Sequence, residues 1–265
     1  AIVLPVLPNQ SLGPPPLDVL NPYKIWLMVV FISGISFLGY VLVKVVGSRQ
    51  GIGLTGLLGG MASSTAVTLS FAQRSQREAE LAKPFALAIT VAWTVMFSRV
   101  VVEVAALNGA LLRVLWLPMA ASAAVGLAYG VYLYFSQRTD EEGEVVFSNP
   151  FELGPAVKFG LLYAVVQLVS KAAQMYLGNT GVYLSSVVAG LADVDAITLS
   201  MAELSRAAGG VSLITAQRAI VLAAMSNTVV KGSIVLTSGS PALRRALWPG
   251  FALMLVTGIG VAFLI

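Results

Sequence analysis

Two segments of this chain, 130 positions apart, carry the same unusual pattern of residues. The first polar segment, residues 51–76, reads GIGLTGLLGGMASSTAVTLSFAQRSQ, and the second polar segment, residues 181–206, reads GVYLSSVVAGLADVDAITLSMAELSR. Both place a glycine-rich turn with hydroxyl or acidic side chains inside apolar sequence, where unpaired polar groups are costly. The two segments are therefore predicted to form the functional centre of the molecule.

The remainder of the chain is apolar enough to indicate a membrane protein. Hydrophobic residues make up 57% of the chain and charged residues 11%, and the mean hydropathy is +0.87. These values favour a polytopic membrane protein over a soluble protein with a large core. The chain has no cysteine and no histidine, which excludes disulfides, thiolate or imidazole metal sites and a Ser-His-Asp triad.

The net charge of +4 and the pI near 9.4 are explained by cationic loops beside membrane helices. No basic run is interleaved with aromatic residues, so no nucleic-acid partner is predicted.

Six long apolar runs predict membrane helices, and they fall into two matching halves. The predicted helices cover residues 22–46, 84–106, 111–135, 157–177, 211–236 and 243–265. The expected fold is all-α and polytopic, with two homologous repeats of about three transmembrane helices plus one broken or re-entrant segment each. The predicted division is 1–20 as the end of a preceding membrane segment with a proline-rich linker, 21–136 as repeat 1, 137–148 as an acidic connecting loop, and 149–265 as repeat 2.

The orientation of the two repeats depends on whether the polar segments cross the membrane. If each segment crosses, a half has four spans and the repeats are parallel; if each dips in and returns, a half has three spans and the repeats are inverted. The 16 Lys and Arg residues then divide evenly in the crossing arrangement and ten to six in the dipping one. Because an uneven charge distribution is typical of membrane proteins, we expect inverted repeats.

Asp193 and Asp195 are the strongest candidate ligands. A carboxylate at membrane depth costs about 2.5–3.5 kcal/mol on insertion scales unless it is paired, hydrated or bound to an ion. With Thr198 and Ser200 they form an all-oxygen set that suits Na⁺, Mg²⁺, Ca²⁺ or Mn²⁺, or a proton relay. The alternative is a carboxylate that caps a broken helix and is neutralised by Lys231 or Arg218.

In the first polar segment the corresponding candidates are hydroxyl groups. Ser63, Ser64, Thr65 and Thr68 are predicted to help bind an ion at a half-helix end. The alternative is close helix packing, in which small and hydroxyl residues are common. Because Ser63 and Thr65 align with the two aspartates, the halves are expected to complete one asymmetric site where they meet.

Two cations inside apolar helices also align between the halves. Arg99 and Lys231 are predicted either to hold an anionic substrate or to neutralise the carbonyl ends of the broken helices, the alternative being snorkelling to the membrane interface. Asn227 lies in a polar turn beside Lys231 and is expected to face the protein interior and to help bind the substrate or ion. The four tryptophans are interpreted as interfacial anchors: Trp26, Trp93, Trp116 and Trp248.

The motifs NPYKIWLMVVFISGISFLGY, GLTGLLGGMASSTAVTLSFAQRS and GLADVDAITLS resemble a bacterial membrane domain of unknown function found C-terminal to an MgtC/SapB-type domain. The resemblance runs from about Leu4 to Ile265. It implies that an MgtC/SapB-type membrane domain precedes this chain, and it modestly favours divalent cations. It supplies no catalytic or binding residues.

These observations predict an ion transporter of the bacterial inner membrane, with a cation bound between the two repeats and no tightly bound cofactor. A homodimer is expected. One alternative is an anion transporter that uses Arg99 and Lys231, with a coupling cation at the aspartates. Another is a regulatory membrane subunit that does not transport. An enzyme is not expected, because no nucleophile and base stand in register.

Overall fold

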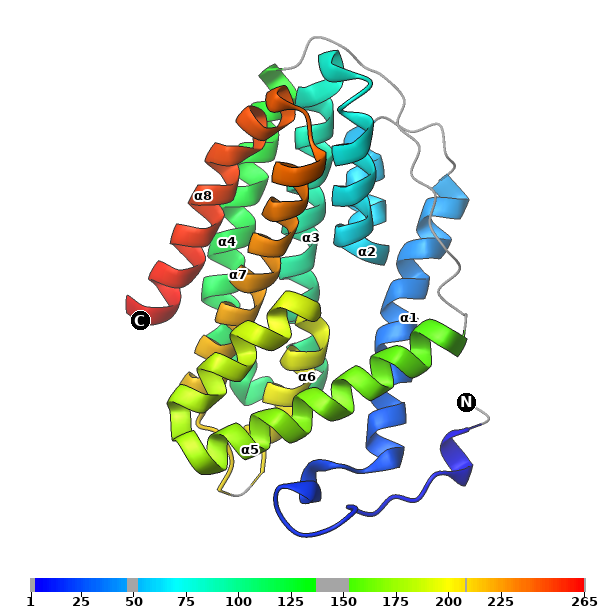
Figure 1. The fold of residues 1–265 in the computed structure, drawn as a ribbon, viewed down its shortest axis with the longest axis vertical. Coiled ribbons are helices and arrows are strands. Elements are labelled where there is room, and N and C mark those ends of the chain that lie inside the picture. Colours follow the sequence, from blue (N-terminus) through cyan, green and yellow to red (C-terminus); the bar gives the residue numbers. More distant parts are fainter. Residues whose placement is uncertain (1–2, 47–51, 137–152, 208, 265) are drawn as a thin grey trace. The chain divides into compact units, whose positions relative to one another are not determined.

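The computed structural model describes residues 3–46, 52–136, 153–207 and 209–264, and all regular structure within them is helical (Figure 1). The α-helices are α1 (Pro22–Val46), α2 (Ile52–Arg74), α3 (Ala82–Leu107), α4 (Gly109–Ser136), α5 (Leu153–Ala192), α6 (Val194–Leu204), α7 (Leu213–Ser238) and α8 (Pro241–Leu264). Three short 3₁₀ helices precede α1 and α3: η1 (Leu4–Val6), η2 (Leu17–Val19) and η3 (Ala79–Leu81).

The described residues form a polytopic helical membrane protein. Seven of the described helices are long and apolar enough to cross a membrane. Six correspond to the predicted helices, and their ends agree to within a few residues except that α5 continues to Ala192. The seventh is α2, which covers the first polar segment. Asn21 caps the start of α1, because its side-chain oxygen accepts a hydrogen bond from the Lys24 amide at 3.1 Å.

The helices group into two compact units. Unit 1 contains residues 1–34, 100–116 and 150–227, and unit 2 contains residues 35–99, 117–149 and 228–265. Each unit thus takes residues from both predicted halves of the sequence. The predicted boundary at 137–148 lies outside the described residues, so the division into repeats stays a prediction.

In unit 2, α2 is interrupted in its middle. Ser63 has φ −165° and ψ 103°, an extended conformation within a helix, and its hydroxyl oxygen accepts a hydrogen bond from the Ala66 amide at 3.2 Å. The two halves, residues 52–62 and 64–74, are each roughly 16 Å long at 1.5 Å per residue. Each is about half the thickness of the hydrocarbon core of a bilayer.

The first half of α2 runs in the same direction as α3. Gly56 lies against the backbone of Ala88, and Gly60 lies against Ala92, where an added Cβ atom would come within 2.7 Å of the Ala92 Cα atom. Both numbers increase together, so the chain advances along α3 from residue 56 to residue 60. The absence of side chains at these two glycines allows the close approach.

The second half of α2 returns along α3. The Trp93 indole donates to the Thr68 hydroxyl at 2.9 Å, and the Phe71 ring stacks on the Phe85 ring with centroids 5.1 Å apart. Here the residue number rises on α2 and falls on α3. Together the two sets of contacts show that α2 descends beside α3, turns near Ser63 and comes back.

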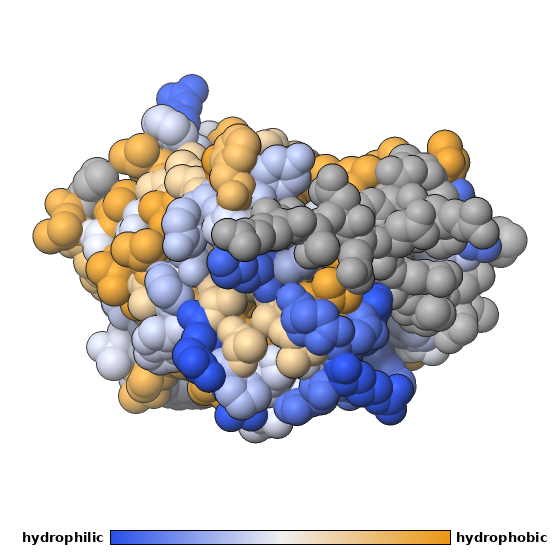
Figure 2. Space-filling view, turned by 90° about the horizontal axis from the view of Figure 1, so that it is seen from above, coloured by the Kyte–Doolittle hydropathy of each residue, from blue (hydrophilic) through white to orange (hydrophobic). Residues whose placement is uncertain are grey.

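Hydrogen bonds connect four helix ends at one end of unit 2. The Ser240 amide donates to the Ser75 hydroxyl at 2.8 Å, and the Lys83 ammonium donates to the Ser136 carbonyl at 3.1 Å. These bonds bring together the end of α2, the start of α3, the end of α4 and the α7–α8 turn, at the top of Figure 1. Figure 2 looks onto this end of the structure and shows hydrophilic side chains gathered toward the lower centre of the view and hydrophobic ones mainly at its left.

In unit 1, α5 reverses its course at Gly178 (Figure 1). Gly178 has φ 58° and ψ −143°, a conformation that favours glycine. The chain then continues to a second break at Asp193, which has φ −159° and ψ 128° and precedes α6. This break corresponds to Ser63 at the offset of 130.

Two hydrogen bonds connect the end of α6 to the turn between α3 and α4. The Asn108 side-chain amide donates to the Ser205 hydroxyl at 3.0 Å, and the Arg206 guanidinium donates to the Leu107 carbonyl at 2.9 Å. Ser205 corresponds to Ser75 in the first polar segment. Each polar segment therefore ends on the helical turn that belongs to the other half of the sequence.

Candidate functional site

Both helix breaks are capped in the same way. The Asp193 carboxylate accepts a hydrogen bond from the Ala196 amide at 2.9 Å, as Ser63 does from Ala66. A side-chain oxygen in this position satisfies one of the free amides at a helix start. The capping interpretation of Asp193 is thus seen directly, and a carboxylate at a helix N-terminus is also favoured by the helix dipole.

The helical geometry of α6 separates the other predicted ligands of the second polar segment. Asp195 lies in the first turn, and Thr198 is three residues later on the same face. Ser200 is two residues beyond Thr198 and so points to a different side of the helix. Asp195 and Thr198 thus share a face at the start of α6, next to the Asp193 cap, and Ser200 lies on another face.

Thr198 and Ser200 have buried hydroxyls with no hydrogen-bond partner among the described residues. Hydroxyls inside helices usually bond to the carbonyl four residues earlier, as Thr68 does to the Ser64 carbonyl at 2.7 Å. An unsatisfied buried polar group costs about 1–3 kcal/mol. Both hydroxyls of α6 are therefore candidates to bind a ligand or water.

The carbonyl end of α5, just before the second break, is met by side chains of α7. The Ser226 hydroxyl donates to the Val187 carbonyl at 2.8 Å, and the Asn227 amide donates to the Gly190 carbonyl at 3.0 Å. Gly190 lies against Ala223 as Gly60 lies against Ala92. Asn227 therefore faces the interior of its unit, as predicted, and is engaged with a helix end.

Arg99 meets the carbonyl end at the first break. Its guanidinium donates to the Met61 carbonyl, two residues before Ser63, at 3.2 Å. This contact is the one expected of a cation that neutralises a broken helix. Lys231 is 1% exposed, and its ammonium lies 2.7 Å from the Met96 sulfur atom. It does not extend to the surface, so the snorkelling interpretation is wrong for Lys231.

The hydroxyl residues of the first polar segment differ in exposure. Ser64 and Thr68 are buried, Ser63 is half-buried, and Thr65 is exposed. Thr68 is held between the Ser64 carbonyl and the Trp93 indole. Trp93 is fully buried, so its interpretation as an interfacial anchor is wrong. The indole N–H requires a buried acceptor, and Thr68 supplies it.

The structure brings the candidates together in two groups. Asp193, Asp195, Thr198, Ser200 and Asn227 belong to unit 1, and Ser63, Ser64, Thr65, Thr68, Arg99 and Lys231 belong to unit 2. Their predicted meeting in one site stays a prediction. Among the described residues, no group of three or more Asp, Glu, His or Cys side chains is placed to hold a metal ion.

A polar stripe on α5 was missed by the sequence analysis. Tyr163, Gln167, Ser170 and Gln174 recur at intervals of four, three and four residues, which places them on one face of the helix. The side-chain oxygens of Gln167, Ser170 and Gln174 are buried and have no hydrogen-bond partner among the described residues. The helical spacing of these polar residues is visible in the sequence, but their burial on one face of α5 is seen only in the structure.

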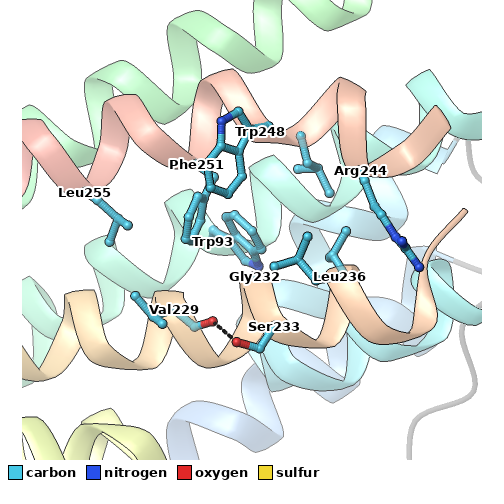
Figure 3. A pocket seen from close by; sticks show the side chains of 11 residues that line it. Trp93, Val229, Gly232, Ser233, Leu236, Arg244, Trp248, Phe251 and Leu255 are labelled. Carbon is cyan, nitrogen blue, oxygen red and sulfur yellow. Dashed lines mark hydrogen bonds between the residues drawn. The ribbon is translucent and has the colours of Figure 1, made fainter. Parts of the chain in front are cut away.

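Unit 2 also holds an apolar cavity of about 320 Å³ between α3, α7 and α8. The rings of Trp93, Trp248 and Phe251 gather in its middle, and Arg244 lies at one end (Figure 3). Ser233 lines it as well, but its hydroxyl donates to the Val229 carbonyl at 2.9 Å. Such a lining suits hydrocarbon better than a hydrated ion.

Comparison with known proteins agrees with the resemblance seen in the motifs. A family model described as a domain of unknown function (DUF4010) matches residues 30–239, from within α1 to the end of α7, including both breaks. A protein of Aquifex aeolicus (strain VF5), described as uncharacterized, is 34% identical over 193 residues, covering 72% of this chain and 84% of the relative. No solved structure matches. The expected MgtC/SapB-type neighbour stays a prediction. The chain belongs to the DUF4010 family of membrane domains of unknown function.

Proposed function

We propose that this chain is a secondary ion transporter built from two inverted repeats, each with one re-entrant broken helix. The observation that carries the proposal is the pair of equivalent breaks, capped by Ser63 and Asp193. Transporters commonly bind their ions at broken helices whose free amides and carbonyls lie at membrane depth. Movement of one repeat against the other would expose the site to each side in turn.

The contacts of α2 support re-entry of the first polar segment. Its first half advances along α3 and its second half returns to the level of Phe85. A segment with halves of roughly 16 Å reaches about the middle of the hydrocarbon core and no further. Irregular backbone at that depth is tolerated where it is buried in protein or lines a cavity.

The bond between Ser75 and Ser240 supports re-entry of the second polar segment. Between these residues the chain passes through α3, α4, the first part of α5, the second polar segment and α7. Five crossings would put Ser75 and Ser240 on opposite sides of the membrane, and four crossings put them on the same side. Their hydrogen bond of 2.8 Å requires the same side, which favours a second segment that does not cross.

The contact of Asn108 with Ser205 supports the same conclusion independently. Only α4, the first part of α5 and the second polar segment lie between them. Two crossings place them together and three do not. With both segments re-entrant, each half has three spans, and the halves have opposite orientations.

This topology predicts that Arg77 and Ala207, both exposed and both just after a polar segment, lie on opposite sides of the membrane. Arg77→Cys and Ala207→Cys should react with a membrane-impermeant maleimide from opposite sides of sealed vesicles. The chain has no cysteine of its own, so each label reports one position. Labelling of both from the same side would rule out inverted repeats of this kind.

The proposed cation site centres on Asp195 and Thr198, with Asp193 at the adjacent cap. A carboxylate and hydroxyl oxygens at a helix start form a hard-ligand set, and the buried Thr198 hydroxyl has no partner among the described residues. Arg99 is engaged with the Met61 carbonyl, which supports a charge-compensating role over the alternative of an anion site.

The first test is the thermal stability of the purified protein across Na⁺, Mg²⁺, Ca²⁺, Mn²⁺ and pH. A cation that binds only the folded state stabilises it by roughly 2.7 kcal/mol at a hundredfold excess over Kd, or about 5–10 °C in Tm for a chain of this size. Asp195→Asn should abolish the shift, and Glu80→Gln, an exposed carboxylate in η3, should leave it unchanged.

Flux of the same cation into proteoliposomes then separates transport from sensing. A shift without flux in any ion gradient would leave the regulatory alternative as the better account. A chain that no cation stabilises, with Asp195→Asn indistinguishable from the natural protein, would refute the cation site.

A further inference from the structure

We propose that the polar stripe of α5 lines a water-filled path, wide enough for a small hydrophilic cation, inside unit 1. The stripe consists of Tyr163, Gln167, Ser170 and Gln174. Three of these carry a side-chain oxygen that is buried and has no hydrogen-bond partner among the described residues. The inference concerns the access of water and small cations to the interior of unit 1 and does not require that the chain transports an ion. Under the proposed function, the path would lead the ion toward its site.

The burial pattern of α5 places the stripe on its inner face. Tyr163 is 1% exposed, Gln167 5% and Ser170 fully buried, while Val165 and Val169, which point elsewhere on the helix, are about half exposed. Tyr163, Gln167 and Ser170 therefore do not face lipid, while Gln174 is half-buried with a buried side-chain oxygen. The Gln167 amide donates to the Tyr163 hydroxyl at 2.8 Å, which uses the donor and leaves the acceptor oxygen of Gln167 to other partners.

The neighbouring helix offers polar groups of the same kind. α6 contacts α5 within unit 1, and its buried Thr198 and Ser200 hydroxyls also have no partner among the described residues. Two contacting helices thus bury five polar oxygens that their own unit does not satisfy. Buried polar groups are normally hydrogen-bonded, and water is their usual partner where protein groups are not.

The oxygen atoms that line the path indicate that it admits small cations. Amide and hydroxyl oxygens are neutral hard ligands, which replace part of the hydration shell of a small cation without trapping it. The path is therefore hydrated, and it runs on the unit that holds the break at Asp193.

Silver ion is a suitable probe, because it is small, hydrophilic and reacts with thiols. The chain has no cysteine, so Ser170→Cys introduces a single, nearly isosteric target. The protein in nanodiscs is exposed to Ag⁺ for increasing times, quenched and denatured, and its remaining free thiol is counted with a maleimide. Val166→Cys, a buried apolar position on the same helix at 6% exposure, and Val169→Cys, at 49%, are the matched controls.

We expect Ser170→Cys to react at least tenfold faster than both controls, with Gln174→Cys giving the same result should Ser170→Cys fail to fold. Equal, slow reaction of Ser170→Cys and Val166→Cys in folded protein would overturn the path. Equally fast reaction of all positions would overturn it as well, since access would not follow the stripe. Fast, selective reaction in a protein that no cation stabilises would retain the path and reject the proposed function.

Discussion

Asp193→Ser should abolish the cation-dependent stabilisation of the protein while leaving its fold intact. The side chain at position 193 accepts a hydrogen bond from the Ala196 amide, and serine does the same at the equivalent position 63. Ser and Asp are similarly good caps, so the Tm without added cation should change by less than about 2 °C. Thermal unfolding with and without the stabilising cation measures both quantities.

Two further variants complete this experiment. Asp193→Ala removes both the cap and the charge, and it should cost about 1 kcal/mol of folding free energy in addition to the cation effect. Ser63→Asp retains a cap and adds a carboxylate at the first break. If Asp193→Ser keeps the full cation-dependent shift, Asp193 is a cap only, and Asp195 alone carries the charge of the site.

Gly60→Ala should destabilise the protein even though alanine is the better helix former. Its Cβ atom would come within 2.7 Å of the Ala92 Cα atom, and backbone on the facing helix cannot yield as a side chain can. Overpacking of this kind typically costs about 1–3 kcal/mol, while the change in helix propensity gains roughly 0.8–1 kcal/mol. The net cost is therefore up to about 2 kcal/mol, which corresponds to a fall in Tm of up to about 8 °C.

Gly34→Ala in α1 is the matched control. No atom lies within 4 Å of the Cβ position there, so the substitution should be neutral or slightly stabilising. Gly190→Ala, which would bring a Cβ atom within 2.7 Å of the Ala223 Cα atom, should resemble Gly60→Ala. Equal Tm values for Gly60→Ala and Gly34→Ala would show that α2 does not depend on its close approach to α3.

The helix ends were predictable because they depend on local chemistry. Asn21, Asn108 and Ser240 each accept a hydrogen bond from an amide three residues later, and a capping residue followed by an apolar run is a local signal. Both breaks were predictable for the same reason, since a glycine and a capping side chain interrupt apolar sequence.

Features that depend on distant partners were not predictable. The return of α2 along α3 depends on the stacking of Phe71 on Phe85 and on the hydrogen bond from Trp93 to Thr68. Trp93 was misread because the sequence does not reveal which acceptor its N–H will meet. The α5 stripe was missed because Gln167 and Ser170 are single polar residues in an apolar run, and their significance appears only when their burial is known.

The end of each polar segment is hydrogen-bonded to a turn in the other half of the sequence, and this affects the order in which contacts can form during synthesis. Ser75 meets its partner Ser240 across 165 residues, which a ribosome adds in roughly 10–30 s. During that time α2 can already pack on α3, but the Ser75 hydroxyl lacks the Ser240 amide until the α7–α8 turn has been made. Residues 1–136 made without residues 153–264 would lack both the Ser75–Ser240 and the Asn108–Ser205 hydrogen bonds, so the two parts of the sequence complete each other only within one polypeptide.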